Sequence, residues 1–275
     1  MIGRGPARGL LFVLVGTGGL FAGCGPSPDV TVTVFAAASL RNAVDLAATA
    51  YTASVPGIRF LVSADSSAAL RVQIEQGAPA DLFLSADAVN PARLVDDGLA
   101  DGAPIAFASA DLAIVVPAGN PAGIGDPMDL ARAGTRIIAA GPEVPITAYA
   151  NRLVAELAGL DGYPVDFAER YAANVHSRED NARAVIAKVE LGEGDAGIVY
   201  EPDARASSAT WTIPLPDGVR IAATYAGVVV RGAGAAEAAR AFLAWLAGPD
   251  GGSVLAGLGF ERAGAVAIPA GALMP

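Results

Sequence analysis

Short segments rich in β-branched residues alternate with helical segments along most of this chain. Thr31–Phe35 and Ile58–Ser63 are expected to form strands, and an expected helix follows each of them, at Leu40–Tyr51 and Ala68–Gln76. The alternation continues with expected strands at 81–85, 112–116, 136–139 and 196–200, and expected helices at 147–158 and 181–191. Parallel neighbouring strands need a crossover connection, which is usually a helix. The sequence therefore predicts an α/β fold with mostly parallel sheets.

The pattern changes after Pro202. Thr210–Pro214 and Arg220–Val230 are expected to form a pair of strands. Ala235–Ala247 is expected to be an alanine-rich helix, and a short helix is expected near Ser253–Leu258. The strict alternation of strand and helix is therefore expected to end near this proline.

Two serines lie where an expected strand ends and an expected helix starts. Ser39 and Ser67 are each explained by helix capping, because a serine hydroxyl accepts hydrogen bonds from first-turn amides. Two such units side by side also allow another interpretation. The carboxyl ends of parallel strands line one crevice, and helix N-termini that point into it form an anion site without a charged side chain. Capping and anion binding both remain open at this point.

Composition excludes several classes of protein. The 275 residues are 53% hydrophobic and 17% charged, which is not a disordered composition. The formal net charge of −10 argues against a nucleic-acid partner. The single histidine, His176, and the single cysteine, Cys24, exclude a disulfide framework within the chain and zinc sites built from several such residues.

Few residues suggest catalysis. His176 lies in a polar stretch and is expected to be an exposed loop residue. Carboxylates at strand ends can act as acids or bases, but capping and solvation are the roles expected here. Four aspartates occupy such positions: Asp81, Asp87, Asp195 and Asp203.

The N-terminus has the pattern of a secretion signal. Arg4 and Arg8 precede the apolar stretch Leu10–Phe21, and small residues follow up to Cys24. This resembles the lipobox of bacterial lipoproteins, in which cleavage makes the cysteine the lipidated N-terminus, although Phe21 stands where that pattern prefers leucine. We expect a lipoprotein signal peptide over residues 1–23 and lipidation of Cys24. The alternative is an ordinary secretion signal with a coincidental cysteine.

A series of specific motifs occurs in order between about residues 29 and 265. They read VFAAASL at 34–40, SSAAL at 66–70, QIEQGAPADLF at 73–83, SAD at 85–87, PEVP at 142–145, Tyr149, VELGE at 189–193, DAGIVY at 195–200 and DA at 203–204. In these motifs the sequence resembles the bacterial periplasmic molybdate-binding proteins. Those proteins are the substrate-binding subunits of molybdate ABC importers.

The resemblance implies a two-lobed periplasmic binding protein of type II, an α/β fold. Each lobe is a mostly parallel sheet flanked by helices, and the ligand lies in the interlobe cleft. The implied organisation is a signal peptide at 1–23, a tether at 24–28, lobe I at 29–108 plus 215–270, and lobe II at 109–214.

The resemblance also implies the residues that bind the anion. Two serines of one lobe bind it by hydroxyl and amide, and the other lobe supplies two backbone amides and a tyrosine hydroxyl. By their motifs, these positions are Ser39, Ser67, Ile146, Ala182 and Tyr200. The molybdenum is reached only through its oxyanion, with no direct protein ligand to the metal. No catalytic residue and no cofactor are expected.

A pocket of donors alone is suited to a fully deprotonated tetrahedral dianion. Monohydrogen phosphate carries a proton that finds no acceptor there, and an unpaired buried polar group is costly. Cavity size must then separate molybdate and tungstate from the smaller sulfate.

Two positions depart from the family pattern. Asp65 precedes the second serine motif where alanine–glycine is common, and a carboxylate facing the cleft would repel a dianion or accept the proton of phosphate. We expect Asp65 to point outward or to cap the helix. Ile146 and Thr147 replace a usual alanine–glycine pair, so Ile146 is expected to narrow the cavity and Thr147 to restrict the turn.

The sequence therefore predicts a lipid-anchored receptor that binds molybdate and tungstate and delivers them to an ABC permease. It would be a monomer on the extracytoplasmic face of the cell membrane or in the periplasm, with no nucleic-acid partner. One alternative is a receptor for sulfate or phosphate, with Asp65 as an acceptor. An enzyme on the same scaffold is a remote alternative, because Ser39 and Ser67 have no obvious histidine or lysine partner. An envelope protein without a ligand would leave Tyr200 and the two serines unexplained.

Overall fold

The computed structural model describes residues 1–3 and 30–267. Apart from its first three residues, the expected signal peptide lies outside the described residues, as do Cys24 and the tether. In the described part of the chain, no helix combines the length and the apolar character needed to cross a membrane.

Ten strands of the described chain form one sheet. Its order is β2-β1-β3-β9-β4-β7-β5-β6, and β8 and β10 also pair with β4. The strands are β1 (Val30–Ala37), β2 (Ile58–Asp65), β3 (Leu82–Ser85), β4 (Ala100–Pro117), β5 (Ile137–Ala140), β6 (Val175–Glu179), β7 (Ala196–Tyr200), β8 (Thr210–Ile213), β9 (Ala222–Val230) and β10 (Glu261–Ala267).

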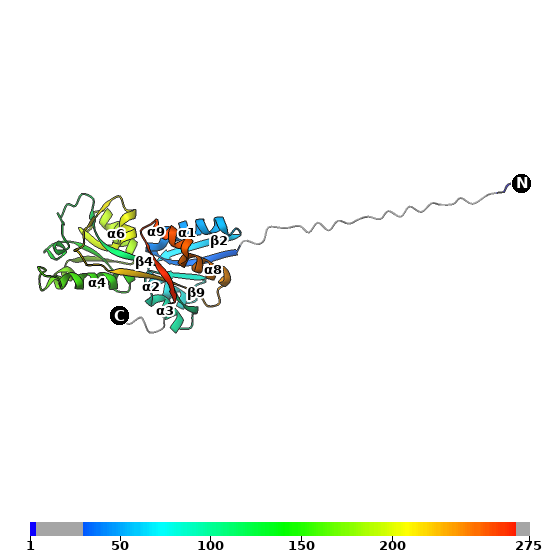
Figure 1. Ribbon diagram of the computed structural model, residues 1–275, viewed down its shortest axis with the longest axis horizontal. Helices are drawn as coiled ribbons and strands as arrows, with labels where there is room; N and C mark the ends of the chain where they lie inside the picture. The colour runs from blue at the N-terminus through cyan, green and yellow to red at the C-terminus, as the bar shows by residue number, and fades with distance from the viewer. Residues whose placement is uncertain (4–29, 268–275) are drawn as a thin grey trace.

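Helices flank the sheet along its whole length (Figure 1). The α-helices are α1 (Arg41–Ser54), α2 (Ser67–Glu75), α3 (Val89–Asp96), α4 (Pro145–Ala158), α5 (Phe167–Ala173), α6 (Ala182–Glu190), α7 (Glu201–Ala206), α8 (Ala236–Ala247) and α9 (Pro249–Ala256). Two short 3-10 helices are η1 (Ala38–Leu40) and η2 (Pro127–Ala131). Figure 1 shows α4 and α6 at one end of the molecule and α1, α8 and α9 at the other.

The long strand β4 belongs to both ends of the sheet. Its residues 100–111 pair with β9, and its residues 112–117 pair with β7 and β8. We call β1, β2, β3, β9 and β10 the first half, and β5, β6, β7 and β8 the second half. The chain passes from the first half to the second along β4 and returns between β8 and β9.

Apolar strand residues account for the core. Val32, Val34, Phe83 and Ile114 are inaccessible to solvent, which fits strands that are covered by helices on both faces. In the first half, Tyr51 of α1 contacts Phe242 of α8 edge to face, with ring centroids 5.2 Å apart. Helices α1 and α8 are therefore held to the sheet by burial of their apolar faces.

The predicted α/β fold is confirmed, and the sheet is more mixed than the mostly parallel one expected. The pairs β1–β2, β1–β3, β5–β6 and β5–β7 are parallel, whereas every pairing of β4 and β9 is antiparallel. The antiparallel pairings arise where the chain crosses between the two halves. The helices α3, α5 and α7 were not predicted from the sequence.

Two local predictions are wrong. The segments expected at 210–214 and 220–230 do not pair with each other, because β8 and β9 both pair with β4. β4 is 18 residues long, so it accommodates the two partners at successive stretches. His176 is exposed as predicted but lies in strand β6, not in a loop. Alternation of half-buried and exposed residues along β6 explains how a polar stretch forms an edge strand.

Candidate functional site

Ser39 lies in η1, directly after the first strand. It is buried, and its hydroxyl oxygen accepts a hydrogen bond of 3.4 Å from the Tyr225 hydroxyl of β9. The residue that precedes η1 is Ala37, and no side chain caps this helix. The capping interpretation of Ser39 is therefore wrong. Its hydroxyl bonds instead to Tyr225, which lies 186 residues later in the sequence.

Ser67 is the first residue of α2 and is only 1% exposed. Its hydroxyl oxygen accepts a hydrogen bond of 3.1 Å from the Ala86 amide, which follows strand β3. Ser66 occupies the N-cap position and makes no side-chain capping bond. Ser67 therefore does not cap α2. Its hydroxyl oxygen is the acceptor in this bond, so its O–H hydrogen remains available for donation.

Two further helices begin at buried backbone amides. Ile146 is the second residue of α4, after Pro145, and Ala182 is the first residue of α6. First-turn amides have no partner within their own helix. The Asn181 side chain accepts from the Ala184 amide at 3.0 Å, so the N-cap of α6 leaves the Ala182 amide unused. Each of these N-termini carries the positive end of a helix dipole.

Tyr200 ends strand β7 and is 1% exposed. Its hydroxyl is buried and has no hydrogen-bond partner. The Tyr200 ring lies 5.5 Å from that of Tyr225, measured between centroids. Burial, with the nearby Tyr225, Tyr149 and Asp87, raises the pKa of Tyr200 well above its usual range. The phenol therefore keeps its proton at neutral pH and is an unsatisfied donor.

Tyr149 and Tyr225 were not predicted as site residues. The Tyr149 hydroxyl of α4 accepts from the Thr224 amide of β9 at 3.2 Å, so it joins the second half to the first. Burial raises the pKa of Tyr149 to about 12. Tyr149 belongs to the family motifs, which is a signal that was available. Tyr225 resembles any core aromatic of a strand, so only its contact with Ser39 reveals it.

A groove of about 630 Å³ separates parts of the two halves. Asp65 and Ser66 line it from the first half, and 141–144 and 178–180 line it from the second. Ser39 lines another cavity, of about 170 Å³, together with Arg183 and Asp203.

The structure brings the expected site residues together only in part. Ser39 and Tyr200 meet through Tyr225, whereas Ser67 lies next to residues that line the groove. Neither of the two cavities is lined by Ser67, Ala182 or Tyr200.

Asp65 lies at the groove. One of its carboxylate oxygens accepts a hydrogen bond of 2.7 Å from the Ser66 amide. At least one acceptor position of the Asp65 carboxylate is therefore occupied by a hydrogen bond within the protein. The Ile146 side chain is fully buried and lines a different cavity, beneath α4, so it is absent from the lining of this groove.

The four aspartates at strand ends are structural. Asp87 precedes Ala88, the N-cap residue of α3, and accepts from the first-turn amide of Asn90 at 3.0 Å, so it satisfies a first-turn amide without being the N-cap itself. All four are buried, so the expected role in solvation is wrong: Asp81, Asp87, Asp195 and Asp203. Asp203 pairs with Arg183 at 3.1 Å, but its other oxygen is buried and unpaired. Burial raises the pKa of Asp203 to about 6.

The predicted binding residues themselves supply donors, whereas the unpaired Asp203 oxygen is an acceptor at the cavity that Ser39 lines. Serine hydroxyls, first-turn amides and a phenol are donors, and donors of this kind bind an anion without a cationic side chain. In the described residues, no group of three or more histidine, cysteine, aspartate or glutamate side chains is placed to hold a metal ion.

A family model for bacterial extracellular solute-binding proteins matches residues 32–261. The chain belongs to this family. Its members are non-enzymatic binding subunits of ABC transporters. The fold is that of the type II periplasmic binding proteins.

Individual relatives agree with the resemblance found in the sequence motifs. The molybdate-binding protein ModA of Mycobacterium tuberculosis is 32% identical over 233 residues, covering 84% of this chain and 85% of the relative. ModA of Escherichia coli is 31% identical over 255 residues, covering 87% and 92%. The resemblance to molybdate-binding proteins is confirmed.

Solved structures show the same fold. The periplasmic molybdate-binding protein of Azotobacter vinelandii superposes with a TM-score of 0.69 at 22% identity, covering 83% of this chain and 98% of that one. The sulfate-binding protein SubI of Mycobacterium tuberculosis superposes with a TM-score of 0.75 at 26% identity, covering 85% and 87%.

Proposed function

We propose that this solute-binding protein is a receptor for molybdate and tungstate. The observation that carries the proposal is the buried, unpaired hydroxyl of Tyr200, which adjoins the Tyr225–Ser39 pair. A buried donor without a partner costs free energy unless a ligand satisfies it. The relatives named for molybdate binding supply the identity of that ligand.

The binding set consists of Ser39, Ser67, Ile146, Ala182 and Tyr200. Each provides a hydroxyl or a first-turn amide, and a hydrogen bond to a charged group contributes about 1.5–3 kcal/mol. Helix dipoles at α2, α4 and α6 add to the attraction for a dianion. Several such bonds in a closed cleft support tight binding even after the cost of closure.

Binding requires the two halves to approach each other. We assign lobe I to residues 29–108 plus 215–270 and lobe II to 109–214. The chain crosses between them along β4 and between β8 and β9, so closure would pivot near these two crossings. Ser39 and Ser67 would then face Ile146, Ala182 and Tyr200 across the cleft.

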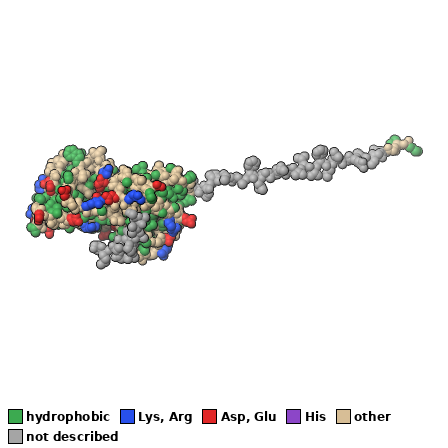
Figure 2. Space-filling model, in the orientation of Figure 1, with side chains coloured by type: hydrophobic (Ala, Val, Ile, Leu, Met, Phe, Trp, Pro, Cys, Tyr) green, Lys and Arg blue, Asp and Glu red, His purple; other side chains and the backbone are tan. Residues whose placement is uncertain are grey.

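The protein surface does not steer the anion. Acidic and basic side chains are interspersed on the face shown in Figure 2, and the net charge is −10. Salt screens distant charges over about 10 Å, so the local donors decide affinity. The selectivity against phosphate comes from the lack of an acceptor for its proton.

The cellular role follows from the family and from the N-terminal pattern. After cleavage of residues 1–23, lipidation of Cys24 would anchor the protein to the outer face of the cell membrane through the tether at 24–28. The protein would act as a monomer and deliver its anion to an ABC permease. It needs no cofactor and no nucleic acid.

A receptor for sulfate is the second candidate, because the superposition on a sulfate-binding protein is also close. A receptor for phosphate is a less supported form of this candidate, because it requires Asp65 to accept the proton of the bound phosphate.

Calorimetric titration of the chain without residues 1–28 tests the proposal. Molybdate and tungstate should bind one-to-one, and sulfate and phosphate should bind about a hundredfold more weakly. Tight sulfate binding without molybdate heat would make the second candidate correct. Tight phosphate binding would make Asp65→Ala the next variant, since this substitution removes the proposed acceptor.

A further inference from the structure

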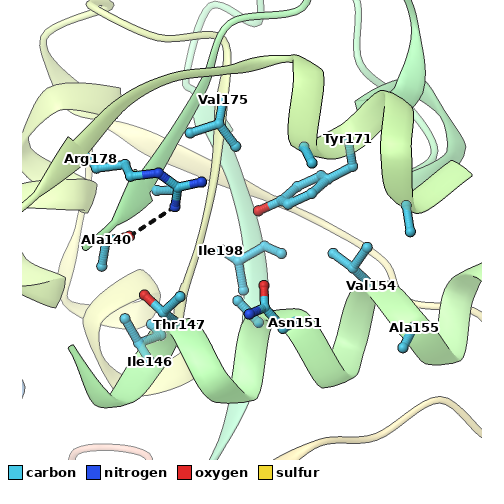
Figure 3. A pocket seen from close by; sticks show the side chains of 14 residues that line it. Ala140, Ile146, Thr147, Asn151, Val154, Ala155, Tyr171, Val175, Arg178 and Ile198 are labelled. Carbon is cyan, nitrogen blue, oxygen red and sulfur yellow. Dashed lines mark hydrogen bonds between the residues drawn. The ribbon is translucent and has the colours of Figure 1, made fainter. Parts of the chain in front are cut away.

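A third cavity lies beneath α4, and it shares Arg178 with the groove. Its volume is about 240 Å³, and it is lined by residues of α4, α5 and the strands β5, β6 and β7 (Figure 3). Alanines of these elements, including Ala139, Ala150 and Ala168, form much of its wall and leave space that larger side chains would fill. We call this cavity the α4 pocket.

One side of the α4 pocket carries donors. The Arg178 guanidinium of β6 reaches into it and donates to the Ala140 carbonyl at 3.4 Å. Among the described residues, no carboxylate forms a salt bridge with Arg178. A guanidinium has five donor hydrogens, so most of its donors remain available to a ligand.

The Tyr171 hydroxyl points across the same space toward Arg178 (Figure 3). Tyr171 is 7% exposed and comes from α5. Burial raises the pKa of Tyr171 to about 12, although the Arg178 charge opposes the shift. The phenol therefore stays protonated and serves as a donor at neutral pH.

The remaining walls are mainly apolar, and Thr147 and Asn151 are the polar residues among them. Val154, Val175 and Ile198 lie around the pocket, and no aspartate or glutamate is among the residues that line it. An inorganic oxyanion would satisfy Arg178 but would leave these walls without a partner. A ligand with one anionic end and a compact apolar body matches both parts.

We propose that the α4 pocket is a second binding site, for a small organic monocarboxylate. Its carboxylate would bind the Arg178 guanidinium and accept a hydrogen bond from the Tyr171 hydroxyl. Its apolar body would pack on Val154, Val175 and Ile198. This proposal does not rest on molybdate binding, although the Ile146 side chain lines the α4 pocket and Arg178 lines both this pocket and the groove.

Titration of the full-length protein with benzoate, followed by calorimetry, tests this site. Benzoate should saturate a single site, and benzamide, which has a similar shape but no charge, should bind about tenfold more weakly. Equal binding of the two probes, or no saturable binding of benzoate, would overturn the proposal.

Variants locate the site. Arg178→Met should lower benzoate affinity about tenfold, and Tyr171→Phe should lower it by a smaller factor. Arg152→Met is the matched control, because Arg152 is an exposed arginine of α4 that does not line the pocket. Unchanged affinity in Arg178→Met, or an equal loss in Arg152→Met, would contradict the assignment.

Arg178 also lines the groove, so a further variant must separate the two places. Ala168→Leu fills the α4 pocket from α5 and does not touch the groove. It should abolish benzoate binding and leave molybdate binding unchanged. Full benzoate affinity in Ala168→Leu would place benzoate outside this pocket and refute the proposal. The thermal unfolding of each variant verifies that it is folded.

Discussion

The hydroxyl groups of Tyr149, Tyr200 and Tyr225 differ in whether they have a hydrogen-bond partner, and this difference bears on where a ligand binds. Tyr149 and Tyr225 use theirs in hydrogen bonds to Thr224 and Ser39, whereas that of Tyr200 is buried without a partner. Native interiors rarely leave a donor unpaired, because each unpaired donor costs about 1–3 kcal/mol. Among the described tyrosines, Tyr163 and Tyr200 both have a buried, unpaired hydroxyl, and Tyr200 is the one that lies beside the Tyr225–Ser39 pair of the proposed site.

Tyr200→Phe should separate binding from folding. Removal of the unpaired hydroxyl should leave the free energy of unfolding unchanged or higher, and molybdate affinity should fall about tenfold because one charge-assisted bond is lost. Tyr163→Phe is a matched control, since the Tyr163 hydroxyl is also buried and unpaired but lies outside the proposed site. Calorimetry and urea unfolding measure the two quantities. Equal molybdate affinity in wild type and Tyr200→Phe would remove Tyr200 from the site.

Asp203 should make stability depend on pH. Burial raises its pKa from 3.8 to about 6 in the folded protein, so the folded state holds a proton that the unfolded state has lost between these values. The stabilisation is complete below the unfolded pKa and is lost as the pH rises through about 6. Relative to Asp203→Asn, the free energy of unfolding should fall by up to about 3 kcal/mol across this range. Urea unfolding at several pH values measures it, and parallel curves for the two proteins would show that Asp203 does not titrate there.

At the scale of elements, close approach decides which substitutions the helices tolerate. Gly251 and Gly252 are neighbours in α9, and both are buried. A Cβ atom on Gly251 would lie 2.5 Å from the Leu246 Cα and the Trp245 carbonyl of α8, which are backbone atoms. A Cβ atom on Gly252 would meet only the Arg262 side chain, at 2.9 Å, and that side chain can move.

These two glycines should therefore respond differently to alanine. Gly251→Ala should lower the free energy of unfolding by about 1–3 kcal/mol, because overpacking against backbone outweighs the gain in helix propensity. Gly252→Ala should be close to neutral or stabilising by up to about 1 kcal/mol. Chemical unfolding of both variants measures the difference. Similar destabilisation by the two substitutions would show that α8 and α9 are packed less closely than described.

At the scale of the molecule, β4 is the strand that joins the two halves into one sheet. Its first residues pair with β9 and its last with β7 and β8. The Tyr149–Thr224 hydrogen bond adds a link between α4 and β9. An arrangement with two crossings and a groove between the halves is suited to closure about a ligand.

Molybdate should make the protein more compact. Closure of the groove should reduce the radius of gyration measured by small-angle X-ray scattering, because the two halves approach each other. Ser67→Ala with molybdate is the control, since loss of a donor should weaken binding and require more ligand for the same change. A radius of gyration that is unaffected by saturating molybdate would mean that binding occurs without closure.

The sequence by itself determined the local elements and, through its motifs, the family. Alternating β-branched and helical segments predicted most strands and helices. The resemblance implied Ser39, Ser67 and the amides of Ile146 and Ala182 as binding positions, and their role stays a prediction. These features depend on neighbours in the chain, so local patterns reveal them.

Only the tertiary structure decided which strands pair and which side chains meet. β8 and β9 joined β4, not each other, and Tyr225 reached Ser39 from 186 residues away. The pocket beneath α4 likewise joins Tyr171 and Arg178 from separate elements. Such contacts depend on how the elements pack and on the cost of closing long loops, and neither leaves a periodic pattern in the sequence.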